Sequence, residues 1–250
     1  MRLFYLRYGI TIFYLSVIQS QVFNVKPYLQ NIDSTSVNIL WECNSGDQSI
    51  VKWGETLDLE SEIEANVNHH INNFHIHHAQ LTQLDPGTKY YYKIIIGSLE
   101  SDTSSFITPN SHVAESPLTL IAMSDMQTDG NNQTKFAEII NDGIIDYVQN
   151  NYGGNTNENL DMILIPGDLV NTGTNYLHWK DEFFAQSEPL FSSVPFYPVL
   201  GNHEVNANLY FQYFDFEENG TPGYEEHWWY KDNSNVRIIG LNSNGPYQIQ

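Results

Sequence analysis

Residues 196–204 read FYPVLGNHE, in which an apolar run, Phe196–Leu200, is followed at once by Gly201, Asn202, His203 and Glu204. A short apolar run between polar segments is typical of a strand that is covered on both faces in an α/β sheet. Glycine lets the chain turn sharply after the strand, and the polar residues then stand at its carboxyl end. Ligands of open α/β sheets bind beyond the carboxyl ends of the strands. The stretch therefore predicts an α/β domain with a functional site at this strand end.

Two earlier apolar runs are organised in the same way. The run 118–123 is followed by SDMQ (124–127), and the run 161–166 is followed by GDLVN (167–171). One Gly-Asp pair is usually a turn, but three strand ends that each offer Asp, Asn, Gln or His are harder to explain as turns. We expect them to converge on one place.

Helical spacing separates these strands. Apolar residues recur at helical intervals from Phe136 to Val148, although Gly143 weakens that helix, and aromatic residues do so over 176–190. A fourth apolar run covers 236–241. Strands that alternate with helices predict an α/β layered domain over residues 118–250.

The preceding part of the chain, residues 22–108, has a different pattern. Residues 36–41 (SVNILW) alternate polar with apolar, and several other short strands are separated by turn signals. The stretch LDPGTKYYY (84–92) resembles the corner of a fibronectin type III-like sandwich, in which a tyrosine hydroxyl ties a turn to the backbone. We expect an all-β sandwich with Trp41 in its core, a buried, inert Cys43, and a polar linker at 109–117.

The first twenty residues predict a signal peptide. Arg2 and Arg7 precede a short apolar run, 10–18, and no acidic residue occurs before it. The run is short for a membrane span, so we expect residues 1–20 to be removed, the mature protein to have no stable membrane span, and the destination to be extracellular or periplasmic. An uncleaved N-terminal anchor is the alternative.

The charge excludes one class of function. Ten Lys and Arg residues oppose 30 Asp and Glu residues, which gives a formal net charge of −20. Binding of nucleic acid through a basic surface is therefore not expected. An acidic protein can still act on phosphates if bound cations supply the positive field.

The three strand ends together resemble the signature blocks of calcineurin-like metallophosphoesterases, whose fold is an α/β/β/α four-layer domain. A fibronectin-like domain in front is the arrangement of the members that resemble purple acid phosphatases. The resemblance implies a dinuclear site for Fe, Mn or Zn, in which Asp125 binds the first metal, Asp168 bridges both and Asn202 binds the second. It makes His203 the residue that contacts the phosphoryl group and helps to neutralise or protonate the leaving oxygen. Glu204 would orient these ligands.

Two positions depart from the family pattern. Gln127 stands where the family most often has histidine, and an amide oxygen binds transition metals more weakly than imidazole does. Asn171 stands where purple acid phosphatases have the tyrosine whose charge transfer to iron produces their colour, so an iron-containing form should not be purple. The family also completes its site with later histidines, whereas no histidine follows His227. We therefore expect an incomplete domain, truncated at its C-terminal end, with little or no activity on its own.

Three functions stay open at this point. The favoured one is a metal-dependent phosphomonoesterase of the acid-phosphatase type. A phosphodiesterase would use the same metals, and a non-catalytic exported binding protein would have lost them.

Elsewhere, His75 and His77 could form a surface metal site or belong to a polar strand face. His227 and Trp228 could shape a substrate pocket or pack in a core, and His178-Trp179 is expected to pack rather than catalyse.

Overall fold

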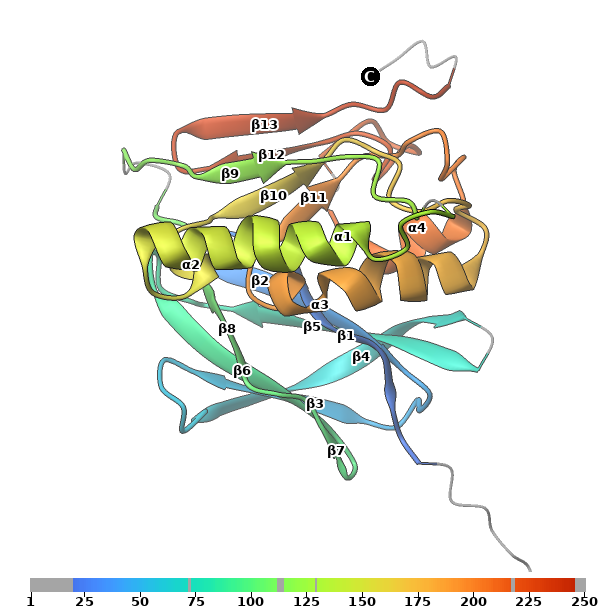
Figure 1. The fold of residues 1–250 in the computed structure, drawn as a ribbon. Coiled ribbons are helices and arrows are strands. Elements are labelled where there is room, and N and C mark those ends of the chain that lie inside the picture. The colour runs from blue at the N-terminus through green and yellow to red at the C-terminus, as the bar shows by residue number, and fades with distance from the viewer. Residues whose placement is uncertain (1–19, 72, 112–114, 129, 217–218, 246–250) are drawn as a thin grey trace, which may run out of the picture.

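The computed structural model describes residues 20–71, 73–111, 115–128, 130–216 and 219–245 (Figure 1). An all-β part precedes an α/β part, which confirms the predicted fold class. The predicted signal peptide lies outside the described residues except for Ser20, and the linker is described only at its two ends. Within the described residues, no helix is long and apolar enough to cross a membrane.

The all-β part is an antiparallel, eight-stranded arrangement in the order β1-β2-β5-β4-β3-β6-β7, with β8 paired to β6. The long strand β4 joins its two halves, because its first residues pair with β3 and its last residues pair with β5. The strands are β1 (Phe23–Gln30), β2 (Ser36–Cys43), β3 (Ser49–Gly54), β4 (Ser61–Ile71), β5 (Phe74–Thr82), β6 (Lys89–Ile96), β7 (Leu99–Glu100) and β8 (Ser104–Ile107).

The core of this sandwich follows from the alternation of its strands. Trp41 is fully buried between the two halves, as predicted, and Cys43 is buried beside it. The Tyr90 hydroxyl accepts a hydrogen bond of 2.9 Å from the backbone N–H of Asp85, so the expected tyrosine corner is present. His77 is fully buried, and its Nδ1 lies 2.8 Å from the Ser49 hydroxyl. The idea of a surface pair formed by His75 and His77 was therefore wrong.

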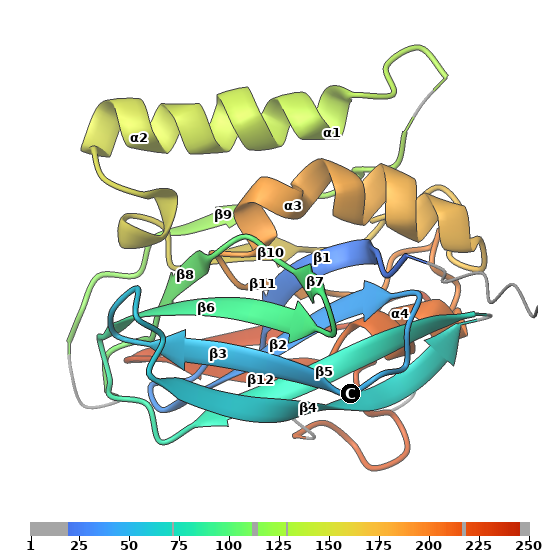
Figure 2. The same cartoon turned by 90° about the horizontal axis from the view of Figure 1, so that it is seen from below.

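The α/β part contains a three-stranded parallel sheet in the order β11-β10-β9 and an antiparallel pair, β12-β13. The continuous helix formed by α1 and α2 lies beside α3 on one side of the parallel sheet (Figures 1 and 2). The elements are β9 (Leu120–Ala122), α1 (Lys135–Glu138), η1 (Ile139–Asp146), α2 (Tyr147–Tyr152), η2 (Thr156–Glu158), β10 (Met162–Ile165), η3 (His178–Phe184), α3 (Ala185–Phe191), β11 (Phe196–Pro198), α4 (Asn208–Tyr213), β12 (Trp229–Asn233) and β13 (Val236–Gly240). Here η1 and η3 are π-helical segments, and η2 is a short 3-10 helix.

The two parts share a hydrophobic core. The outer face of the sandwich contributes Val25, Tyr28, Leu40 and Ile76 to the same buried cluster as the sheet β9–β11 and its helices. The Tyr28 hydroxyl donates a 2.6 Å hydrogen bond to the Tyr213 carbonyl across this boundary. The sandwich is therefore packed against the domain that carries the candidate site.

Candidate metal centre

The loops that follow β9, β10 and β11 meet at one edge of the parallel sheet. The Met126 N–H donates to the Asp168 carbonyl at 3.0 Å, and the Gly173 N–H donates to the His203 carbonyl at 2.9 Å. A cavity of about 140 Å³ opens where the loops meet, and Asp125, Asp168 and Asn202 all line it. The structure thus brings together oxygen donors from three strand ends that are far apart in the sequence.

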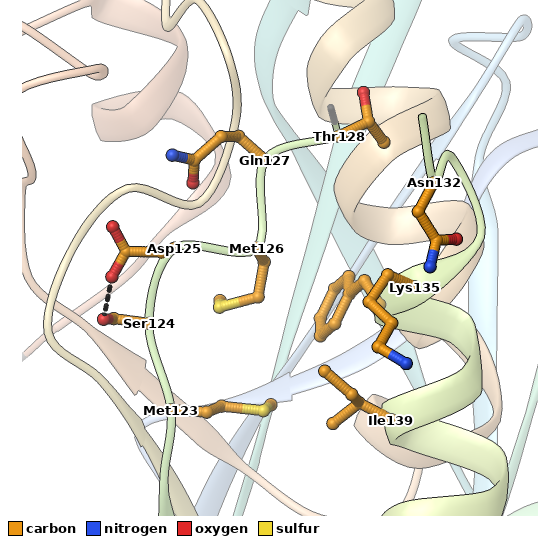
Figure 3. Close-up of a pocket in the computed structure, with 10 residues that line it drawn as sticks. Met123, Ser124, Asp125, Met126, Gln127, Thr128, Asn132, Lys135 and Ile139 are labelled. Carbon is orange, nitrogen blue, oxygen red and sulfur yellow. Dashed lines mark hydrogen bonds between the residues drawn. The ribbon is translucent and has the colours of Figure 1, made fainter. Parts of the chain in front are cut away.

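The segment after β9 sends alternate side chains to opposite sides. Figure 3 shows the Asp125 carboxylate and the Gln127 amide on one side of the segment, and Met123 and Met126 facing the helix on the other. Met126 is buried against that helix, which anchors the segment. The Ser124 hydroxyl donates a short hydrogen bond to the Asp125 carboxylate. The Gln127 side-chain oxygen is buried and has no hydrogen-bond partner among the described residues.

Two of the candidate ligands have an unusual backbone conformation. Asp125 and Asp168 have φ angles of 57° and 54°, in the left-handed region that residues other than glycine rarely adopt. Gly167, with φ of 100°, precedes Asp168 and completes the sharp turn after β10. A Cβ atom at Gly201 would lie 2.1 Å from the Asp168 nitrogen, so only glycine lets the second and third loops approach this closely.

Glu204 holds the second and third loops together. Its side chain is fully buried and accepts backbone hydrogen bonds from Asp168 (3.0 Å), Leu169 (2.9 Å), Val170 (3.2 Å) and Gly201 (2.7 Å). Burial raises the pKa of the Glu204 carboxyl, while the four N–H donors favour its ionised form. Glu204 therefore acts on the site through the backbone that presents Asp168.

His203 is oriented by the second loop. Its Nδ1 lies 2.7 Å from the Asn171 carbonyl oxygen, which can only accept, so Nδ1 carries a proton and donates. Nε2 is therefore the ring nitrogen at which this imidazole can gain or lose a proton. The His203 N–H also donates to the Asp168 carboxylate at 3.1 Å. These contacts place the predicted histidine next to the predicted bridging ligand.

Sequence reasoning missed three residues of this region. Ser243 and Asn244 line the cavity, and the Asn244 amide donates to the Leu200 carbonyl at 2.6 Å. They follow β13, so the rule of polar residues at strand ends would have found them too. Glu182 accepts from the Thr128 hydroxyl (2.9 Å) and from the Asn171 N–H (3.0 Å), which ties the first loop to the second. No sequence pattern pointed to that contact.

The other singled-out aromatic and histidine residues make packing contacts away from the cavity. Trp179 is fully buried, as expected of packing, and Trp228 is buried with its ring stacked on Tyr224 at a centroid distance of 4.9 Å. The His227 ring packs on Phe211 at 4.8 Å. None of these three lines the cavity at the strand ends.

The donor set suits a cation. Two carboxylates and the Asn202 amide line the cavity and offer oxygen ligands. Gln127 does not line this cavity but borders the neighbouring pocket between its own segment and the helix α1. Within the described residues, no group of three His, Cys, Asp or Glu side chains is placed to hold a metal ion. An amide ligand, that of Asn202, is therefore a necessary member of a site built from the described residues.

Comparisons with known proteins match both parts of the chain. Residues 118–247 match the family described as calcineurin-like phosphoesterase, and residues 22–108 match the N-terminal domain of purple acid phosphatases. Purple acid phosphatase 21 of Arabidopsis thaliana is 31% identical over 137 residues, which are 54% of this chain and 26% of that protein.

Two solved structures share the fold over most of the chain. A purple acid phosphatase from yellow lupin seeds superposes with a TM-score of 0.63 at 17% identity, over 89% of this chain and 46% of that chain. The structure of PhoD gives 0.65 at 14% identity, over 88% of this chain and 52% of that chain. The chain thus spans about half the length of these two proteins.

Proposed function

The chain belongs to the calcineurin-like phosphoesterase family, and on that premise we propose that it hydrolyses phosphoesters with two metal ions held at the ends of β9, β10 and β11. One observation carries the proposal. Asp125, Asp168 and Asn202, from three separate strand ends, line a single cavity. The favoured substrate is a small phosphomonoester, and the protein is exported.

The residues at the cavity have distinct roles in this proposal. Asp125, together with Gln127 from beside the cavity, would hold the first metal, Asp168 would serve both metals, and Asn202 would hold the second. Fe, Mn or Zn ions in such a pair lower the pKa of bound water and neutralise phosphoryl charge. Glu204 and Gly201 keep the Asp168 backbone in the conformation that aims its carboxylate into the cavity.

His203 supplies the proton chemistry. In the reaction, the bond between phosphorus and the ester oxygen breaks, a bond from phosphorus to the oxygen of water forms, and the leaving oxygen takes a proton. The hydrogen bond from Nδ1 to Asn171 keeps the exchangeable proton at Nε2, where it can be given to that leaving oxygen.

The test uses the mature protein purified from its source. Its intact mass, compared with the 28.7 kDa of this chain, shows whether further residues are present. Metal analysis after dialysis should find bound metal, and an aryl phosphate should be hydrolysed until a chelator removes that metal. Faster hydrolysis of a matched phosphodiester would move the assignment to a diesterase. Retention of no metal, or inactivity with Fe, Mn and Zn, would contradict the proposal.

Two variants expressed from the complete gene sharpen this test. Asp168→Asn removes a charged ligand but keeps a residue that tolerates the left-handed backbone, so it should fold and lose metal and activity. Asp181→Asn is the matched control, because Asp181 is exposed and pairs with Lys180 away from the cavity. Equal activity of the two variants would rule out the assigned role of Asp168.

A further inference from the structure

A carboxylate of the sandwich reaches into the α/β domain beneath the candidate metal centre. Glu42, near the end of β2, is fully buried. Its Oε1 accepts a 2.5 Å hydrogen bond from the Tyr176 hydroxyl, and its Oε2 accepts a 2.7 Å hydrogen bond from the Tyr213 hydroxyl. Each carboxylate oxygen therefore holds one tyrosine of the other domain.

The two tyrosines belong to the two segments that carry Asp168 and His203. Tyr176 follows the loop after β10, three residues beyond Gly173, whose N–H donates to the His203 carbonyl. Tyr213 ends α4, the helix that follows the loop after β11. Trp179 joins both segments, because its Nε1 donates to the Gly173 carbonyl at 2.7 Å and its ring packs against Tyr213 at 5.9 Å.

Other residues of the sandwich hold Tyr176 from the same side. The Asn24 amide donates to its hydroxyl at 3.1 Å, and the Phe74 ring stacks on its ring at a centroid distance of 5.1 Å. Burial raises the pKa of the Glu42 carboxyl, and the hydrogen bonds from Tyr176 and Tyr213 oppose that rise. A buried carboxylate without those donors is strongly disfavoured, so its two partners are held firmly.

We propose that Glu42 is a positioning residue for the phosphoesterase site, and that the sandwich serves the reaction through it. By fixing Tyr176 and Tyr213, Glu42 holds the loops after β10 and β11 in the arrangement in which the Gly173 N–H bonds to the His203 carbonyl. The same arrangement keeps the His203 ring hydrogen-bonded to the Asn171 carbonyl. This inference rests on the proposed function for its catalytic consequence. Its structural consequence stands on the contacts alone.

Amide hydrogen exchange of the chain tests the structural consequence. Glu42→Leu should speed exchange at the Gly173 N–H by about tenfold, because that N–H bonds across the two loops. The Ile163 N–H, which donates to the Pro195 carbonyl in the sheet, should keep its rate. Glu42→Gln retains hydrogen-bonding groups at both positions and should restore the Gly173 rate. Tyr92→Phe is the matched control, since it removes a buried hydroxyl that crosses the same boundary to the Ser192 carbonyl, away from the loops.

If Glu42→Leu does not fold, Tyr176→Phe decides the question, because it deletes one hydroxyl and leaves the ring packing in place. It should speed exchange at Gly173 while Ile163 stays unchanged. Equal acceleration at both amides would mean that the contact only stabilises the fold, and no change at Gly173 would mean that the contact does not hold the loops. Either result would overturn the inference.

Kinetics of the enzyme expressed from its complete gene test the catalytic consequence. Glu42→Leu or Tyr176→Phe should lower kcat by about tenfold to a hundredfold with little change in KM, since misplaced catalytic groups affect the reaction more than substrate capture. Glu42→Gln and Tyr92→Phe should keep kcat. An enzyme that is inactive with every metal refutes the proposed function while the exchange result still decides the loop contact. An active enzyme with unchanged kcat in both Glu42→Leu and Tyr176→Phe refutes the positioning role alone.

Discussion

At the scale of single residues, the site depends on backbone conformations that ordinary residues avoid. Asp125 and Asp168 both lie in the left-handed region, where a residue other than glycine costs about 1–2 kcal/mol, although aspartate tolerates it better than most. The surrounding contacts maintain these conformations, since Met126 bonds to the Asp168 carbonyl and Glu204 accepts from the Asp168 N–H. Strain of this kind concentrates at functional positions.

Gly201 is the position where a single methyl group should disturb the site most. In Gly201→Ala, the new Cβ meets the Asp168 backbone, and overpacking of this kind costs about 1–3 kcal/mol. We expect a lower free energy of unfolding in urea and weaker binding of Mn²⁺ in a calorimetric titration. Gly130→Ala is the control, because nothing lies within 4 Å of its added Cβ. Unchanged Mn²⁺ affinity in Gly201→Ala would show that the close approach of the loops does not matter for binding.

Gln127→His should strengthen the first metal position. Imidazole binds Zn²⁺ better than an amide oxygen does, so we expect the Zn²⁺ affinity to rise by about tenfold, or about 1.4 kcal/mol. Calorimetry on both proteins gives the two dissociation constants, and Gln133→His is the matched control, because Gln133 is exposed and does not line the cavity. Equal Zn²⁺ affinities of wild type and Gln127→His would show that Gln127 does not face the metal.

Part of the site could be read from the sequence, and part could not. Asp125, Asp168 and Asn202 follow apolar runs, so the geometry of parallel strands was enough to bring them to one edge. Glu182 and Glu42 follow no such rule, because their roles arise from contacts with loops that are distant in sequence. Local patterns carry no information about such pairings. His77 was misjudged for a similar reason, since the alternation of β5 does not say which face the second half of the sandwich covers.

At the scale of elements, strand existence was easier to predict than strand length. The runs at 118–123 and 196–200 form the shorter strands Leu120–Ala122 and Phe196–Pro198. Beyond Pro198 the backbone forms one more hydrogen bond to β10, from the Val199 N–H to the Ile165 carbonyl, before it turns toward the site. His227 and Trp228 were interpreted as either pocket or core residues, and strand β12 begins directly after them at Trp229.

Gly143 lies in the helix that runs from α1 through η1 to α2, at a position that does not require glycine. Gly143 is exposed, and an added Cβ would meet only the Ile139 side chain at 3.9 Å. Gly143→Ala should therefore raise the free energy of unfolding by about 0.5–1 kcal/mol, since alanine has the higher helix propensity. Urea denaturation measures the change. A lower free energy of unfolding for Gly143→Ala would indicate that glycine is needed by the wide turns of η1.

At the scale of the whole molecule, the protein and its proposed phosphoester substrate carry charge of the same sign. The formal net charge of −20 repels a phosphate ester until the ester reaches the site. Raising the ionic strength from about 0.01 M to about 0.1 M shortens the screening length from about 30 Å to about 10 Å, so kcat/KM for an aryl phosphate should increase. Metal content is measured at each salt concentration as the control. A decrease of kcat/KM at constant metal content would instead indicate an attractive local field around the cavity.

The boundary between the two domains should make stability depend on pH. The pKa of Glu42 is raised above its ordinary 4.5, so the folded state binds this proton more tightly than the unfolded state does. Its contribution to stability is then greatest below pH about 4.5 and is lost as the pH rises through the raised pKa. The free energy of unfolding of wild type relative to Glu42→Gln should therefore fall as the pH rises above 4.5, as measured by urea denaturation. A rise over that range would contradict the direction of the pKa shift.

The shared core also has a consequence during biosynthesis. Val25, Leu40 and Ile76 leave the ribosome well before Phe196, with which they share one buried cluster. Translation of the roughly 120 intervening residues at about 5–20 residues per second takes on the order of ten seconds. During that interval a nascent sandwich presents an apolar face with nothing yet made to cover it. The first domain thus offers a surface on which the second domain packs once it has been synthesised. Until then, chaperones that bind exposed apolar surface can bind the first domain.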